Sequence, residues 1–90
     1  MMKLGGNIVL DGCDNLEPAT LIVLKKMVGN YARKISEKNA FDELKINLQN
    51  TGDNYKLEAT LTMAGSQDVK NSEDSNLFFA LDNALKEFLQ

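Results

Sequence analysis

The spacing of apolar residues changes along the chain and predicts both helices and strands. Between residues 18 and 38 apolar residues recur at steps of three and four, which predicts a helix with one buried stripe. Pro18 suits the first turn of that helix. Residues 44–49 and 55–63 instead alternate between apolar and polar, so we expect two half-buried strands joined as an antiparallel hairpin. The helical stripe consists of Leu21, Leu24, Val28, Tyr31, Ala32 and Ile35.

Two shorter segments are predicted to complete the sheet. Residues 7–10 form an apolar run between glycines, which predicts a first strand with Ile8 and Leu10 on one face. Residues 67–71 predict a short edge strand in which only Val69 faces the core. Charged residues beside Val69 would then protect this edge from pairing with other chains.

The C-terminal segment predicts a second helix that runs to the end of the chain. Residues 73–75 supply carboxylate and hydroxyl groups that suit its amino end. Phe79 falls on the side opposite the apolar stripe of this helix. It is either covered by a loop or the first helix, or it is a contact surface for RNA or a second subunit. The stripe consists of Leu77, Phe78, Leu81, Ala84, Leu85, Phe88 and Leu89.

These elements predict an α+β fold of βαβββα order. Each predicted strand and helix has one apolar side, so we expect a two-layer sandwich with both helices on one face of a mainly antiparallel four-stranded sheet. A chain of 90 residues has room for one such core, which predicts a single domain over residues 1–90. The other sheet face is predicted to be polar and to lack the aromatic residues on which bases stack in RNA-recognition motifs. It would carry Lys45, Asn47, Gln49, Lys56, Glu58, Thr60 and Thr62.

Three residues of the first helix depart from its stripe. Gly29 costs roughly 1 kcal/mol relative to alanine, so we expect either another element or a partner to pack closely there, with internal packing favoured. Ile22 and Val23 lie off the stripe. We expect partial burial against the preceding loop, with a protein interface as the alternative.

The lack of histidine and the single cysteine argue against catalysis. The chain has no histidine and one cysteine, Cys13, so an intramolecular disulfide is excluded and a general base near neutral pH is not evident. We interpret Cys13 as a small buried residue, and we expect no metal, no cofactor and no enzymatic activity. No segment is predicted to be a signal peptide or to span a membrane, so we expect a cytoplasmic protein.

The charge of the chain is unevenly distributed. The formal net charge is −3, but residues 18–40 carry five bases and one acid and are therefore +4. On helical spacing Lys26 and Arg33 lie one above the other with Asn30 between them, away from the apolar stripe, and Lys25 and Lys34 flank them. This pattern is typical either of a solvated helix face or of a surface that contacts phosphates of a folded RNA.

Three segments resemble the short ribosome hibernation promoting factors and related ribosome-associated translation inhibitors. Residues 8–12 followed by 16–18 are similar to the first strand of that family and its run into the first helix. Residues 55–61 followed by 64–65 are similar to its third strand and small-residue turn. Residues 72–82 resemble its acidic lead-in and the opening of its second helix.

The resemblance implies a protein that binds ribosomal RNA on the small ribosomal subunit near the decoding region and blocks tRNA and mRNA. Lys86 is the base that the second helix would add, with Glu87 where the family commonly has a base, which lowers the expected affinity. A protein-interaction module or homodimer without an RNA role is the alternative. By the resemblance, the RNA-binding residues on the first helix would be Lys25, Lys26, Arg33 and Lys34, to which the helical spacing adds Asn30.

Overall fold

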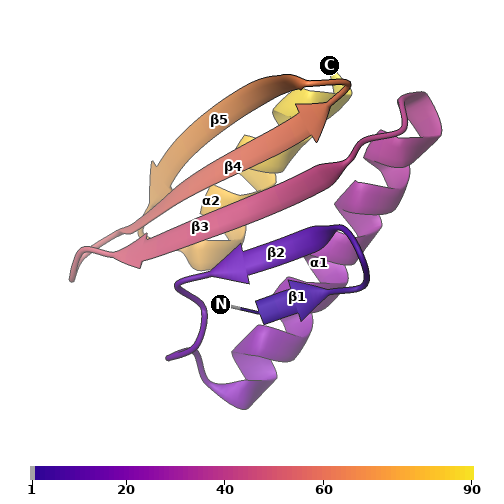
Figure 1. Ribbon diagram of the computed structural model, residues 1–90. Coiled ribbons are helices and arrows are strands. Elements are labelled where there is room, and N and C mark those ends of the chain that lie inside the picture. Colours follow the sequence, from indigo (N-terminus) through magenta and orange to yellow (C-terminus); the bar gives the residue numbers. More distant parts are fainter. Residues whose placement is uncertain (1) are drawn as a thin grey trace.

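The computed structural model describes residues 2–90 as one five-stranded sheet with both helices behind it (Figure 1). The strands lie side by side in sequence order. They are β1 (Met2–Leu4), β2 (Ile8–Asp11), β3 (Glu43–Asn50), β4 (Tyr55–Met63) and β5 (Ser66–Asp74). The helices are α1 (Pro18–Lys38) and α2 (Leu77–Leu85), and α2 continues as the short 3-10 helix η1 (Lys86–Leu89).

The hairpin of β3 and β4 confirms the alternating pattern. Its register places Leu44 opposite Leu61, Ile46 opposite Ala59 and Leu48 opposite Leu57. All six side chains are buried beneath the helices. Pairs of this kind on one face are what fix the register of a sheet, because a slip by one residue would turn the whole apolar set outward.

The sheet has five strands, so the expectation of four strands was wrong, whereas three of its four strand pairings are antiparallel, as expected of a mainly antiparallel sheet. β2 and β3 are parallel, with α1 as the connection between them. β1 is an additional strand that pairs antiparallel with β2 and places Leu4 opposite Ile8. Its three residues are too few to show a period, which is why the pattern did not reveal it. The two-layer α+β architecture with both helices on one face is confirmed (Figure 1).

A glycine fixes the exit of the chain from β2. Gly12 has a φ of +81°, which side-chain-bearing residues rarely adopt. A β-carbon built on it would lie 2.1 Å from the carbonyl oxygen of Leu48 on β3. The next residue, Cys13, lies in the core, where its side chain is fully buried. Burial, with the nearby Asp14 and Asp11 carboxylates, raises the pKa of the Cys13 thiol to about 11.

The β5 strand is longer than predicted and is turned the other way. It pairs with β4 over its full length, and Val69 lies opposite Thr60 on the face away from the helices. Val69 is 44% exposed, so the expectation that it faces the core was wrong. The positions on the helix side are Asp68, Lys70 and Ser72, whose polar character concealed the strand. The pairing with β4, and not an apolar pattern, defines this strand.

The α2 helix begins at Leu77, but its capping residue is not among the residues 73–75 that were predicted. Residues 73 and 74 belong to β5, and the capping residue is Asn76. The Asn76 side-chain oxygen accepts hydrogen bonds from the backbone N–H groups of Phe78 and Phe79, at 2.9 and 3.1 Å. Asparagine is among the best residues at this position because its oxygen satisfies donors that the helix leaves open.

Candidate nucleic-acid interface

The outward face of α1 carries most of the residues predicted to contact RNA. Leu24, Val28, Ala32 and Ile35 are buried against the sheet, as the stripe predicted. Because a helix has 3.6 residues per turn, this burial turns the basic residues outward. Lys26, Asn30, Arg33 and Lys34 are exposed, while Lys25 is half-buried at the flank of the helix.

Two contacts join α1 to the C-terminal helix. The Tyr31 hydroxyl donates a hydrogen bond to Oδ1 of Asp82 on α2. Lys38 Nζ donates to the carbonyl oxygen of Leu89, at 2.7 Å. Both contacts join residues 51 positions apart, so a step of seven residues along α1 matches a step of seven residues along the C-terminal helix. The two helices therefore run in the same direction beneath the sheet.

The surroundings of Tyr31 affect its hydroxyl group and its ring. Burial, followed by the hydrogen bond to Asp82 and its negative charge, raises the pKa of Tyr31 to about 12. Tyr31 is therefore a neutral donor at physiological pH. The ammonium of Lys34 lies 5.8 Å from the centre of the Tyr31 ring, within the range of a cation–π contact. Sequence reasoning assigned Tyr31 to the apolar stripe and missed both roles.

The α2 helix adds an aromatic residue to the helical face. Phe79 is 63% exposed, so the interpretation that a loop or α1 covers it was wrong. Lys86 is exposed at the start of η1, seven residues further along. On an α-helix this separation returns to nearly the same side, so both residues belong to the outward side of the C-terminal helix.

The off-pattern residues of α1 are open to solvent. Ile22 is 57% exposed and Val23 is 45% exposed, so the expected burial against the preceding loop was wrong. Nothing lies within 4 Å of a β-carbon built on Gly29, so the expected close packing there was wrong as well. The alternatives stated for these three residues, a protein interface and a partner that approaches the helix, remain predictions.

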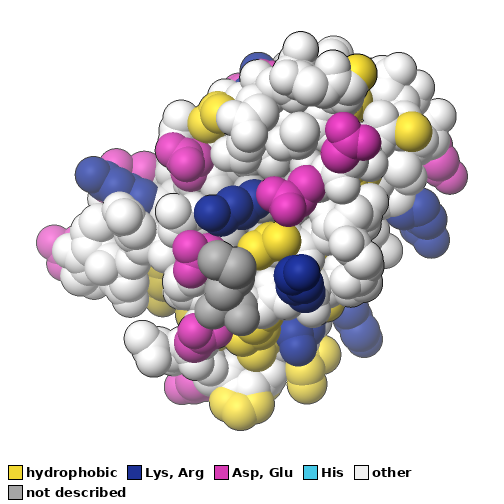
Figure 2. All heavy atoms as spheres, in the orientation of Figure 1, with side chains coloured by type: hydrophobic (Ala, Val, Ile, Leu, Met, Phe, Trp, Pro, Cys, Tyr) yellow, Lys and Arg dark blue, Asp and Glu magenta, His cyan; other side chains and the backbone are white. Residues whose placement is uncertain are grey.

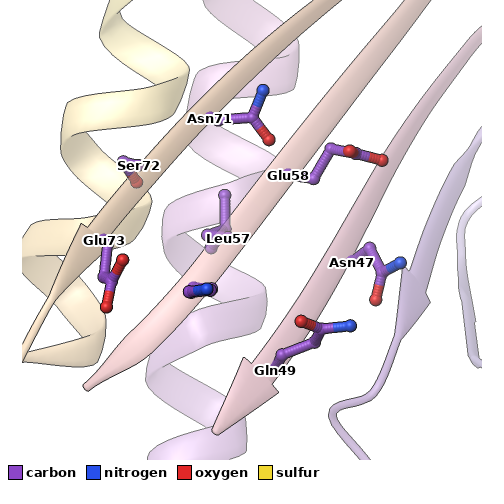
Figure 3. A pocket seen from close by; sticks show the side chains of 8 residues that line it. Asn47, Gln49, Leu57, Glu58, Asn71, Ser72 and Glu73 are labelled. Carbon is purple, nitrogen blue, oxygen red and sulfur yellow. The ribbon is translucent and has the colours of Figure 1, made fainter. Parts of the chain in front are cut away.

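The open face of the sheet, which points away from the helices, carries charges of both signs. It holds a hollow of about 400 Å³ over β3, β4 and β5 (Figure 3). The sheet register places Asn47, Glu58 and Asn71 in one row across it. Lysine and acidic side chains lie next to one another on this side of the molecule (Figure 2). A surface of such mixed sign does not suit a polyanion. The hollow is lined by Asn47, Gln49, Lys56, Leu57, Glu58, Asn71, Ser72 and Glu73.

Residues 2–90 form neither a metal-binding cluster nor a membrane-spanning helix. No group of three or more cysteine, aspartate or glutamate side chains among them is placed to hold a metal ion. No helix formed by these residues has the length and apolar character needed to cross a membrane.

Comparison with solved structures shows that other proteins have this arrangement of strands and helices. The chain has the fold of the Protein Y N-terminal domain. It superimposes on the N-terminal domain of Thermus thermophilus Protein Y with a TM-score of 0.69 and 16% identity, over 89% of this chain and 86% of that one. A ribosomal subunit interface protein from Coxiella burnetii gives a TM-score of 0.60 and 13% identity, over 90% of this chain and 85% of that one.

The sequence matches no family model and no curated protein. At 16% and 13% identity the likeness to the two solved structures is one of fold. The resemblance predicted from three short segments is confirmed at that level.

Proposed function

We propose that this chain binds the ribosome, and that the outward face of α1 contacts structured RNA of the small subunit. The observation that carries the proposal is the arrangement of charge. A chain with a net charge of −3 exposes Lys26, Arg33 and Lys34 together on one helix, opposite its buried stripe. The same fold occurs in a protein described as a ribosomal subunit interface protein.

The spacing of α1 suits phosphates better than bases. Lys26 and Arg33 are seven residues apart, about 10 Å along a helix, so they would contact separate phosphates of a folded RNA. Asn30 lies between them and its amide can donate to a phosphate or sugar oxygen. Contacts of this kind follow the shape of the RNA rather than its sequence. Lys25 and Lys34 would extend the contact along both flanks.

The C-terminal helix would add a second type of contact. Phe79 presents an exposed ring on which an unpaired base can stack, a contact worth about 1–3 kcal/mol per base. Lys86 would add a further charge contact from the same side of the helix. We therefore place Phe79 and Lys86 at the margin of the RNA surface, with Lys26 and Arg33 at its centre.

Such binding would make the protein a translation inhibitor or hibernation factor rather than an enzyme. An inhibitor that occupies the decoding region of the small subunit acts by excluding tRNA and mRNA, which requires affinity and shape but no chemical step. This part of the proposal rests on the resemblance of the sequence to ribosome hibernation factors, and it implies a cytoplasmic location.

The test is co-sedimentation with small ribosomal subunits from the source organism at low and moderate salt. Lys26→Glu/Arg33→Glu should lower the association constant at least about tenfold, because two attractive phosphate contacts become repulsive. Lys3→Glu/Lys56→Glu is the matched control, since it makes the same change of charge at exposed positions on the other sheet face. Equal losses in both double variants, or no association of the wild type at any salt, would overturn the proposal.

Self-association is the second candidate function. It is favoured by the exposure of Ile22, Val23 and Phe79, three large apolar side chains on the helical layer. Association through them would be insensitive to salt and would weaken on Val23→Lys. RNA binding would instead weaken steeply as salt rises.

A further inference from the structure

The strand β5 has one side that no strand covers. It is the last strand in the sheet order, and among residues 2–90 no strand pairs with its outer side. It is nine residues long, whereas β1 at the opposite edge has three. A long uncovered edge offers a row of backbone donors and acceptors to another strand.

The turn before β5 determines which of its backbone groups are free. Ala64 and Gly65 have φ values of +49° and +83°, as in the two-residue turn that suits the twist of a hairpin. Met63 and Ser66, which flank the turn, are paired in the register. Residues flanking such a turn exchange backbone hydrogen bonds, and hydrogen-bonded positions then alternate along the strand. The residues whose N–H and C=O groups point away from β4 are therefore Gln67, Val69, Asn71 and Glu73.

The side chains of β5 are complementary to those of a second, antiparallel copy. If a two-fold axis passes through Val69, the two valines lie opposite each other on the open face of the sheet. Asp68 then lies opposite Lys70 of the second copy, and Lys70 opposite Asp68 of the second copy. Opposite charges in directly opposed positions are favourable, whereas like charges are unfavourable.

Neighbouring registers lack this complementarity. An axis through Asp68 would place the two Asp68 carboxylates opposite each other, and an axis through Lys70 would do the same with two ammonium groups. Within one copy Lys70 Nζ already lies 3.5 Å from Oδ1 of Asp68, so both charges are on the same side of the strand. The charges of Asp68 and Lys70 therefore favour the register centred on Val69 when β5 pairs with β5 of a second copy of this chain.

We propose that β5 pairs antiparallel with β5 of a second copy of this chain, centred on Val69. Gln67, Val69 and Asn71 would each donate and accept a backbone hydrogen bond across the axis, and the two sheets would form one continuous sheet. Because the axis is perpendicular to the sheet, the helices of both copies would lie on the same side. This pairing does not depend on RNA binding and leaves the outward face of α1 open.

Sedimentation equilibrium tests the charge pairs. We expect the wild type to be a weak dimer, because a single strand pair buries little surface. Asp68→Lys should raise the dimer dissociation constant about tenfold, and Asp68→Lys/Lys70→Asp should restore it, since the exchange recreates both opposed pairs. Glu37→Lys, an exposed residue of α1, makes the same change of charge away from β5 and should leave the constant unchanged.

A cysteine at the axis tests the register. The Cα atoms of a hydrogen-bonded antiparallel pair are about 5.5 Å apart, within the range that a disulfide bridges. Val69→Cys should therefore form a covalent dimer under mild oxidation. Asn71→Cys lies on the same face of the same strand but opposite Gln67, so it should not. Cys13 is fully buried and does not compete.

Three outcomes would overturn the proposal. They are a wild type that stays monomeric at every concentration, a charge exchange that does not restore the dimer, and equal crosslinking of Val69→Cys and Asn71→Cys. None of these results bears on co-sedimentation with ribosomal subunits, so failure of the strand pairing is distinguishable from failure of the proposed RNA binding.

Discussion

The two faces of this molecule carry similar numbers of bases but arrange them differently. The outward face of α1 groups Lys26, Arg33 and Lys34 with Glu37 as the acid among them. The open face of the sheet interleaves lysines with acids, because its register brings residues from distant parts of the chain next to one another. The charges on that face are Lys3, Lys45 and Lys56 and Asp11, Glu43, Glu58 and Glu73.

The difference shows why the net charge of a chain says little about its partners. On a helix, one surface is built from residues three, four and seven positions apart, so a local run of bases becomes a basic surface. On a sheet, one surface combines several segments, and their charges offset one another. A chain that is acidic overall can therefore present one positive face to a polyanion.

The largest effect is expected from removing single charges on each face in the presence of small ribosomal subunits. Lys26→Ala and Arg33→Ala should each reduce the slope of log K against log salt by a little under one, because each removes about one phosphate contact. Lys56→Ala on the open face should leave the slope unchanged. The comparison between the faces fails if Lys56→Ala changes the slope as much as Lys26→Ala does.

The next effect concerns the contact that holds the two helices together. Tyr31→Phe should lower the free energy of unfolding by about 1 kcal/mol, because it leaves Asp82 without its hydrogen-bond donor. The measurement is urea unfolding at neutral pH. Tyr55→Phe, a half-buried tyrosine on β4, is the control and should change stability less.

The same bond predicts a dependence on pH. The pKa of Tyr31 is about 12 in the folded protein and about 10 as its ordinary value, so the unfolded chain loses the hydroxyl proton first as the pH rises. The contribution of Tyr31 to stability is then fully present below pH 10 and is lost between about 10 and 12. Other groups titrate in this range, so the observable is the difference between wild type and Tyr31→Phe. A difference that stays constant from pH 9 to 12 would contradict the assigned bond.

A smaller effect is expected at Gly29, at the flank of the basic face. Gly29→Ala should raise the free energy of unfolding by roughly 0.5–1 kcal/mol, since the added methyl group meets nothing within 4 Å and alanine favours helix. Thermal unfolding measures this gain. If the variant is more stable but binds ribosomal subunits more weakly, the partner approaches α1 at Gly29. Unchanged affinity would place the contact elsewhere on the helix.

The smallest effect is expected on the open face of the sheet. Lys56 and Glu73 lie opposite each other in neighbouring strands near the hollow, and both are exposed. Exchanging them should change stability by less than about 0.5 kcal/mol, because exposed pairs are screened by water and salt. Urea unfolding of the double variant measures this. A larger loss would mean that the hollow depends on the original order of the two charges.

Elements whose apolar residues repeat with a clear period were predictable from the residues alone. The α1 helix begins and ends at the residues that the pattern predicted, and β3 and β4 pair as the alternation required. The reason is that burial of one side of a helix or strand imposes a period that is visible in the residues themselves. The position of the bases on the outward face of α1 followed from the same period.

Elements that are stabilised by neighbouring segments could not be predicted from local spacing. β1 is too short to show a period, and β5 is a strand because β4 supplies its hydrogen-bond partners, although its inward positions include Asp68 and Lys70. The Tyr31–Asp82 bond joins residues 51 positions apart, and no local pattern encodes such a distance. Exposure of Phe79, Ile22 and Val23 likewise depends on which elements cover them. The local spacing of apolar residues indicates which side of a segment is buried. The tertiary contacts of that segment depend on residues elsewhere in the chain.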